Sequence, residues 1–294
     1  MFKKKIINLK CSYCECNKSY ESFPYGTTFE GVEFKYYKCN ACLTVNINPK
    51  PSEHIISTMY EKEAYHDIHY SDSQSFDYEK SALLIRSYLS NSSEVLDYGC
   101  GGGHFLKEIK KIGLIGYGVD FGKSTVNNAS QYSGCKIFTV DDFNENFGNL
   151  QFDALHLGDV LEHLIDPGHE LKKLLKRLKP GGLIFIEGPL EENISPVMLA
   201  AKIVGYIKNK LNFGKSIYPP FHLTRANADS QKFFIARIVG HDEFILWNIY
   251  DTGWPYLKNK NLRHFIGLIA IMCSGLKLYK YVLGNRFRAV IKIK

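Results

Sequence analysis

A glycine-rich stretch follows directly on an acidic residue at 95–105, in the sequence VLDYGCGGGHF. Asp97 is followed at alternate positions by Gly99, Gly101 and Gly103. Glycines in such a turn let a ligand approach the backbone, and a helix that begins next offers its first N–H groups to that ligand. The stretch therefore predicts a site for a dinucleotide, a phosphate or an adenosyl cofactor.

Further acids indicate which of these ligands fits. Asp120 ends the next apolar stretch, and Asp141 and Asp142 end the one after it. A carboxylate at the first of these positions can accept hydrogen bonds from both hydroxyls of a ribose, each worth roughly 1.5–3 kcal/mol. An acid at the second can meet an adenine amino group. Because acidic walls repel a pyrophosphate, we expect a cofactor without phosphates, such as S-adenosylmethionine.

Four N-terminal cysteines form two CxxC pairs, Cys11 with Cys14 and Cys39 with Cys42. Strand-like alternation and turn residues lie between the pairs, which would place them on facing hairpins. Two such knuckles offer four thiolates to a tetrahedral Zn²⁺. A bound metal would stabilise this short module, which cannot build much hydrophobic core of its own. We predict a structural zinc with no open coordination position. Cys16 is an alternative ligand, although its offset from Cys14 fits a knuckle poorly.

Strand and helix patterns alternate from residue 82 onward. This alternation predicts an α/β fold in which a parallel sheet is covered on both faces and binds its ligand at the carboxyl ends of the first strands. We expect strands at 93–99, 114–120, 135–142, 152–159, 181–189, 242–250 and 287–294, helices at 166–182, 195–213 and 225–240, and a return to the sheet at 218–223.

Four motifs in this order closely resemble those of class I S-adenosylmethionine-dependent methyltransferases: VLDYGCGGGHF, GYGVDF, FDALHLGDVLEHLIDP and RLKPGG. The resemblance implies a Rossmann-like, seven-stranded sheet that an antiparallel pair of strands closes. With the CxxC module in front, the chain also looks like a subfamily in which a zinc ribbon precedes the methyltransferase domain. Many members of that subfamily act on sugars, polysaccharide precursors or other small metabolites.

The resemblance also implies a role for individual residues. It assigns the methionine part of the cofactor to Asp97, Gly99, Cys100 and Gly101, the ribose to Asp120 and Phe121, the adenine region to Asp141 and Asp142, and the floor under the sulfonium to Leu157. Tyr60, Tyr65 and Tyr70 lie where the family packs a helix over the cofactor, although an aromatic core explains them equally well.

Methylation of a hydroxyl also needs a base. Glu162 and His163 follow the fourth expected strand and are the first candidates, while His222 and Tyr218 lie on a loop that enters the cleft. A structural role for Glu162 and His163 is equally compatible with their position. In some quinone-biosynthesis relatives, an acidic–histidine group near here binds a divalent metal.

These assignments divide the chain into three parts. Residues 1–50 form the zinc-ribbon-like module, and residues 51–80 form a linker with the helix over the cofactor site. Residues 81–294 form the methyltransferase domain, with a cap insertion at 190–222 and an apolar helical insertion at 256–285. The second insertion can pack on the core, on a partner or on a membrane surface.

Charge is unevenly distributed along the chain. Nine Lys and Arg and no acid follow Asp251, whereas the rest of the chain carries 28 basic and 30 acidic side chains. Such a field favours an anionic partner, although a solvated basic surface would look the same. We expect a metabolite, sugar or glycan precursor with negative charge, methylated on oxygen or nitrogen.

Several alternatives stay open at this point. One is an rRNA or tRNA methyltransferase, disfavoured because the slot after the fourth strand reads LGDV, without the NPPY motif of enzymes that methylate base amines. Others are a quinone or lipid methyltransferase that uses residues 262–283 at a membrane surface, and an inactive cofactor-binding module. With no secretory signal visible, we expect a cytoplasmic protein, with the inner face of the membrane as the alternative location.

Overall fold

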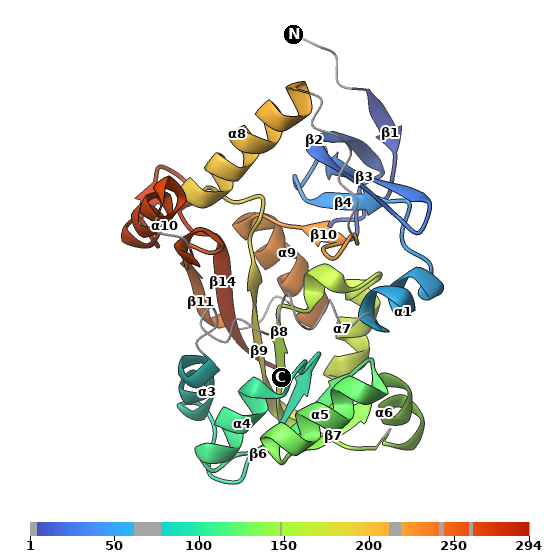
Figure 1. Ribbon diagram of the computed structural model, residues 1–294. Helices are drawn as coiled ribbons and strands as arrows, with labels where there is room; N and C mark the ends of the chain where they lie inside the picture. The colour runs from blue at the N-terminus through green and yellow to red at the C-terminus, as the bar shows by residue number, and fades with distance from the viewer. Residues whose placement is uncertain are drawn as a thin grey trace.

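The computed structural model describes residues 5–61, 78–147, 149–211, 219–240, 244–258 and 261–293. In this part of the chain, a seven-stranded sheet with helices on both faces forms the centre, and a smaller sheet built mainly from the N-terminal segment packs against it (Figure 1).

The central sheet has the strand order β11-β14-β9-β8-β5-β6-β7. Neighbouring strands from β9 to β7 run parallel, whereas β14 is antiparallel to both β9 and β11. The expected seven-stranded sheet with its closing antiparallel pair is therefore confirmed. Its strands are β5 (Glu94–Tyr98), β6 (Ile115–Asp120), β7 (Lys136–Thr139), β8 (Phe152–Gly158), β9 (Leu178–Pro189), β11 (Phe244–Tyr250) and β14 (Arg286–Lys292).

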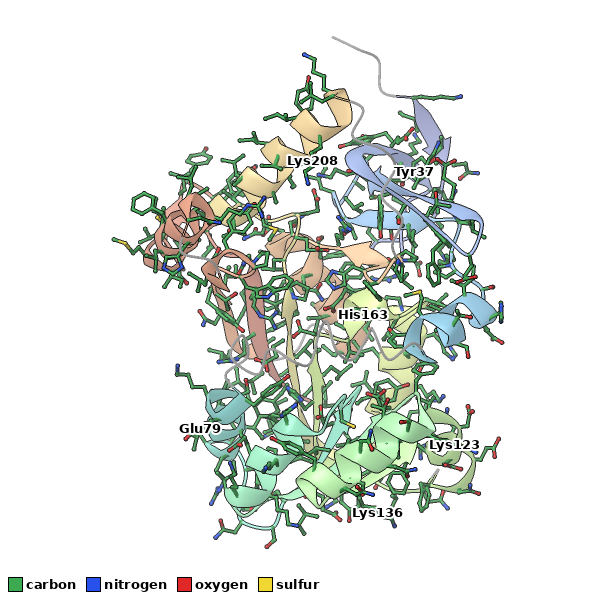
Figure 2. All side chains as sticks on the ribbon, viewed as in Figure 1. Tyr37, Glu79, Lys123, Lys136, His163 and Lys208 are labelled. Atoms are coloured by element: carbon green, nitrogen blue, oxygen red, sulfur yellow. The ribbon has the colours of Figure 1, made fainter. Side chains whose placement is uncertain are left out.

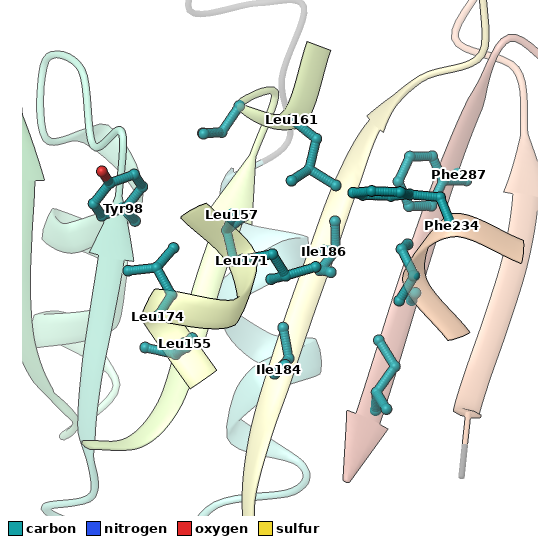
Figure 3. Close-up of a cluster of buried hydrophobic side chains, with 14 of the residues drawn as sticks. Tyr98, Leu155, Leu157, Leu161, Leu171, Leu174, Ile184, Ile186, Phe234 and Phe287 are labelled. Atoms are coloured by element: carbon teal, nitrogen blue, oxygen red, sulfur yellow. The ribbon is translucent and has the colours of Figure 1, made fainter. Parts of the chain in front are cut away.

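Both faces of this sheet are apolar. Successive side chains of a strand point to opposite faces, and hydrophobic residues occupy both sets of positions. Val95 of β5 packs with Ile85 and Phe105 on one face. The next residue, Leu96, belongs to the core of the other face. Figure 3 shows part of that second core, including Leu171. The first face is covered by α3 (Tyr78–Arg86), α4 (His104–Lys111) and α5 (Lys123–Ser133), the second by α6 (Val140–Asn146), α7 (Pro167–Leu175) and α9 (Ala228–Val239).

The smaller sheet has the order β1-β2-β3-β4-β10. Four of its strands come from the N-terminal segment, but β10 comes from the second half of the chain, where Thr224 pairs with Asn46. Helix α1 closes its core, in which Met59 and Leu223 pack together. The elements are β1 (Ile6–Asn8), β2 (Lys18–Phe29), β3 (Val32–Cys39), β4 (Val45–Asn48), β10 (Thr224–Arg225) and α1 (Glu53–Glu61).

Two further helices are α8 (Pro196–Lys210) and α10 (Leu262–Met272), and α10 packs against one end of α8 (Figure 1). They fall within residues 190–222 and 256–285. Short elements complete the fold: η1 (Leu161–His163), η2 (Tyr256–Lys258), β12 (Lys277–Leu278) and β13 (Tyr281–Val282). Across the described ranges, no helix is both long enough and apolar enough to cross a membrane.

Three boundaries differ from the sequence-based expectation. The helix expected at 166–182 ends at Leu175, because Leu178 already pairs with Phe152 and the KPGG stretch lies inside β9 beside an irregularity in the register. The strand expected at 135–142 ends at Thr139, whose side chain caps α6. The return to the sheet after residue 218 leads to β10 of the smaller sheet, because Leu223 enters that core.

Candidate functional site

The turn after β5 has the backbone that a close ligand requires. Gly99, Gly101 and Gly103 have φ angles of 78°, 50° and 77°. A Cβ atom on Gly99 would lie 2.6 Å from a methyl group of Val160, and one on Gly103 would lie 2.9 Å from the Ala129 carbonyl oxygen. Side chains are therefore excluded at Gly99 and Gly103 on both conformational and steric grounds.

Asp120 fixes the same turn from the end of β6. One oxygen of its carboxylate accepts a 2.7 Å hydrogen bond from the N–H of Gly101, and the other accepts a 2.7 Å bond from the N–H of Phe121. A carboxylate offers about four acceptor positions, so an acid at this place is chemically suited to ribose hydroxyls. The residues at this position thus fit the ribose of S-adenosylmethionine.

Asp97 belongs to a buried ionic network beneath the turn. Its Oδ1 lies 2.7 Å from Nδ1 of His156, whose Nε2 lies 3.5 Å from Glu187. Glu187 in turn accepts hydrogen bonds from Arg288 at 2.7 Å and from Ser81 at 2.8 Å. This arrangement commits one oxygen of Asp97 to a histidine and leaves the other for the expected contact with the methionine part.

Electrostatics keep this network charged. Burial alone lowers the pKa of His156, but the carboxylates of Asp97 and Glu187 outweigh it and raise that pKa to about 9. Burial raises the pKa of Glu187, whereas the hydrogen bond and charge of His156 together with Arg288 hold it well below its usual range. The histidine is therefore an imidazolium between two carboxylates at neutral pH.

Two of the expected contacts have side chains that point into the protein. Cys100 packs in a core with Leu106 and Val126, and Leu157 is fully buried beneath the sheet end. A cofactor contact at these positions would therefore involve main-chain atoms.

The acids after β7 lie in the first turn of α6. Both acids are exposed, and Asp142 accepts a hydrogen bond from the Thr139 hydroxyl while its own N–H donates one to the same oxygen. The Asp142 carboxylate is thus partly engaged in capping the helix.

Aromatic side chains meet over the end of β6. Phe121 is half exposed and stacks on Tyr60 of α1, with 5.5 Å between ring centroids and 7° between ring planes. This contact brings the helix at 53–61 next to the expected ribose position. Tyr65, Tyr70 and Tyr218 lie outside the described residues.

A second polar cluster lies where β8 runs into η1. Oε1 of Glu162 is 3.9 Å from Nε2 of His163, whose other nitrogen, Nδ1, is 2.8 Å from the Phe221 carbonyl oxygen. The rings of His163 and His222 meet edge to face with centroids 4.8 Å apart. The three candidates for catalysis, separated by about 60 residues of sequence, are thus brought together.

A carboxylate that the sequence did not point to completes this cluster. Oε2 of Glu191 lies 3.0 Å from Nδ1 of His222 and 3.3 Å from Nε of Arg225. Burial lowers the pKa of His222, but Glu191 outweighs it, so the pKa is raised. Burial raises the pKa of Glu162 to about 8, helped by the nearby charge of Asp159, which keeps this carboxyl protonated at neutral pH.

The smaller sheet supplies one wall of this cluster. The Tyr36 hydroxyl donates to the carbonyl of His222 at 3.0 Å, and the N–H of Leu223 donates to the carbonyl of Glu162 at 2.8 Å. The Arg225 guanidinium lies over the Tyr36 ring. Figure 2 shows His163 in the middle of the molecule, between the smaller sheet, which carries Tyr37, and the elements below it.

Residues 74–231, more than half of the chain, match a family described as "Methyltransferase domain". The chain belongs to this methyltransferase domain family. The expected methyltransferase fold is confirmed, and the membership supports the expectation of S-adenosylmethionine as cofactor. Curated relatives include the ubiquinone biosynthesis O-methyltransferases of Coxiella burnetii, 28% identical over 132 residues, and of Colwellia psychrerythraea, 32% identical over 115 residues. These matches cover 43% and 36% of this chain, and the chain spans about half the length of these relatives, 56% and 46%.

Solved structures share the fold of this methyltransferase at low identity. A chain in the complex of the Haloferax volcanii Trm112 methyltransferase activator with a methyltransferase is 14% identical at a TM-score of 0.54, covering 80% of this chain and 96% of that chain. The plantazolicin methyltransferase BpumL in complex with SAH is 15% identical at a TM-score of 0.51, covering 82% and 94%.

The four N-terminal cysteines of the methyltransferase form one cluster. Their sulfur atoms all lie within 4.8 Å of one another, with Cys11 to Cys42 at 3.6 Å and Cys14 to Cys39 at 3.5 Å. Tetrahedral zinc with Zn–S bonds of about 2.3 Å has S–S edges of about 3.8 Å. The cluster therefore fits zinc, and Cys16 lies outside it.

Sequence reasoning did not single out Asp159, Arg286, Glu191 or Arg225 of the candidate site. Asp159 has a φ of 54° and pairs with Arg286 at 2.8 Å, and Glu191 anchors the second cluster. Asp159 stands in the LGDV slot directly after β8, which was a usable signal. Arg286 and Glu191 carry no motif, since their partners are distant in sequence.

Proposed function

We propose that the protein is an S-adenosylmethionine-dependent methyltransferase that methylates an oxygen or nitrogen of an anionic small metabolite, sugar or surface-polysaccharide precursor. The observation that carries this proposal is the cluster of His163, Glu162, His222 and Glu191 beside the carboxyl end of β8. In this fold, ligands bind at the carboxyl ends of the parallel strands.

The glycine turn, Asp97 and Asp120 would hold the cofactor. Their fit rests on the left-handed backbone of Gly99, Gly101 and Gly103 and on the carboxylates of Asp97 and Asp120 beside this turn. The bound cofactor supplies a methyl group on a sulfonium, so the protein itself has to align the acceptor and manage its proton.

His163 is suited to take that proton. A carbonyl oxygen only accepts, so Nδ1 of His163 donates its hydrogen to Phe221. A neutral ring in this tautomer presents a lone pair at Nε2, which makes Nε2 the general base in our proposal. Glu162, protonated beside it, can donate a hydrogen bond to the acceptor but cannot itself remove a proton at neutral pH.

The charge of the cluster supports an anionic acceptor. Glu162 is neutral, and Glu191 is a single carboxylate between Arg225 and His222, whose pKa it raises. Two groups that can carry positive charge therefore flank one carboxylate, and their side chains are only partly exposed, where charges are weakly screened.

A second candidate mechanism uses the same atoms as metal ligands. Ligand atoms of Glu162, His163 and His222 lie within 4.8 Å of one another, and Oε1 of Glu162 has no hydrogen-bond partner among the described residues. A carboxylate and two imidazoles suit a divalent transition metal. In that case His222 and Glu162 would orient the acceptor through the ion.

One set of assays tests the proposal. The full-length protein is incubated with methyl-labelled S-adenosylmethionine and an extract of its source, which is then separated into nucleic acid, protein, lipid and small-molecule or glycan fractions. We expect label in the last fraction. Label confined to RNA or lipid would contradict the proposed substrate class.

Variants then separate the two mechanisms. His163→Ala should lower kcat about 10²–10⁴-fold while cofactor affinity is kept, and the exposed His169→Ala should have little effect. Activity lost in EDTA and restored by Mg²⁺ or Mn²⁺, but not by Zn²⁺, would favour the metal mechanism.

We also propose that Cys11, Cys14, Cys39 and Cys42 hold a structural Zn²⁺. Hydrogen bonds to the sulfurs support this, from the N–H of Ala41 to Cys39 and from the side chain of Asn46 to Cys11. The module is tied to the rest of the protein next to this cluster, where Tyr13 stacks on Phe234 at 4.1 Å. Zinc would thus stabilise the wall that carries His222.

A further inference from the structure

Helices α8 and α10 and the β12–β13 hairpin carry a large exposed apolar surface. Leu262, Met272 and Tyr279 are 76%, 80% and 94% exposed. Groups of large exposed apolar side chains, unlike single scattered ones, mark binding surfaces. We call this surface the α8–α10 face; its exposed members are Leu199, Ile203, Val204, Tyr206, Ile207, Leu211, Leu262, Phe265, Leu268, Ile269, Ile271, Met272, Leu276, Leu278, Tyr279 and Tyr281.

The packing of α10 explains why its large side chains point outward. The residues that it buries are Gly267 and Ala270. A Cβ on Gly267 would lie 2.9 Å from Leu257 and 3.1 Å from the Gly253 carbonyl, so the helix approaches the protein through its smallest residues. Phe265 and Met272 are therefore left on the outer side, which is the reverse of an ordinary surface helix.

Charges on this face have one sign. The sequence has no Asp or Glu between Glu192 and Asp229 and none after Asp251. Both helices of the face lie within these acid-free stretches (Figure 2 labels Lys208 on α8). Its exposed basic residues are Lys208, Lys210, Arg263, Lys277 and Lys280.

We propose that the α8–α10 face docks on an anionic lipid bilayer. Leu, Ile, Phe and Met side chains would enter the headgroup boundary, and lysines would meet anionic headgroups from the same side. A second copy of this chain would fit the α8–α10 face less well, because its own basic residues would repel the basic residues of this face. α8 begins five residues after Glu191 of the second polar cluster, so docking would turn the segment that joins this cluster to α8 toward the bilayer and toward lipid-linked acceptors.

Vesicle sedimentation with the full-length protein tests this proposal without any methyl acceptor, so its outcome is independent of the proposed reaction. The probes are vesicles of phosphatidylcholine alone and vesicles that also contain phosphatidylglycerol. We expect binding to the second kind that weakens as salt is added. The double variant Phe265→Ser/Met272→Ser should bind about tenfold more weakly or worse, because two exposed apolar side chains no longer enter the bilayer.

Two further variants make the result specific. Lys277→Glu/Lys280→Glu should remove the preference for phosphatidylglycerol. Phe233→Ser, on the exposed side of α9 and outside this face, should bind like the unaltered protein. Thermal unfolding of each variant checks that the fold is kept. Equal binding to both vesicles, no binding at all, or a dimer in light scattering that Phe265→Ser/Met272→Ser dissociates would overturn the proposal.

Discussion

The imidazolium of His156 makes the stability of the protein depend on pH in a definite direction. Its pKa rises from 6.5 to about 9 on folding, because Asp97 and Glu187 flank a fully buried ring. A pKa that is raised on folding contributes stability that is fully present below 6.5 and is lost as the pH rises through 9. At about 1.4 kcal/mol per pH unit, this contribution is about 3 kcal/mol.

The matched variant is His156→Gln. Glutamine can still donate a hydrogen bond to Asp97 but does not titrate. The unaltered protein should lose about 3 kcal/mol more than the variant in its free energy of unfolding between pH 6.5 and pH 9. Titrating groups away from this network are common to both proteins and cancel in the difference.

Urea unfolding followed by circular dichroism at a series of pH values measures this difference. NMR titration of the His156 ring gives the pKa directly. Parallel pH profiles for the two proteins, or a ring that titrates near 6.5, would refute the charged network beneath the cofactor turn.

The remaining predictions concern the cofactor and the zinc. Asp120→Ala should raise the dissociation constant for S-adenosylmethionine at least tenfold, because the bonds to the ribose and the hydrogen bond that holds the glycine turn are lost together. The control Asp229→Ala, at an exposed position, should leave the constant unchanged. Calorimetry measures both constants, and an unaltered value for Asp120→Ala would remove the cofactor assignment. Cys39→Ser or chelation should release one zinc per chain and lower methyl transfer much more than cofactor affinity, because the module holds His222 but not the glycine turn. Metal analysis beside calorimetry decides this, and folding of residues 1–50 without zinc would contradict it.

Local patterns in the sequence sufficed to predict the central sheet, the glycine turn with its acids, and the cysteine cluster. They did not suffice for the second polar cluster. Alternating strands, the glycine turn after Asp97 and the acid at the end of the next strand are adjacent in sequence, so their geometry follows from the strand–turn–helix unit that carries them. The CxxC spacing likewise brings each pair of thiols together within one knuckle.

The rest depended on contacts between distant segments. Arg225 and Glu191 meet His222 only because a two-residue strand joins the N-terminal sheet, and two residues leave no periodic signal. Helix α7 ends early, at Leu175, for a non-local reason as well, because Leu178 pairs with Phe152 of β8. Pro and Gly in KPGG are ordinary helix-stop residues but here lie within a strand.

The two-residue strand β10 has a consequence for how the protein is made. Residues 1–50 leave the ribosome first, but the strand that completes their sheet at Thr224 is synthesised about 10–40 s later at typical elongation rates. During that interval β4 has an open edge, and the core around Met59 lacks Leu223. An unpaired edge of this kind can join another strand. Until Thr224 is synthesised, the nascent module is therefore most open to pairing of β4 with another strand.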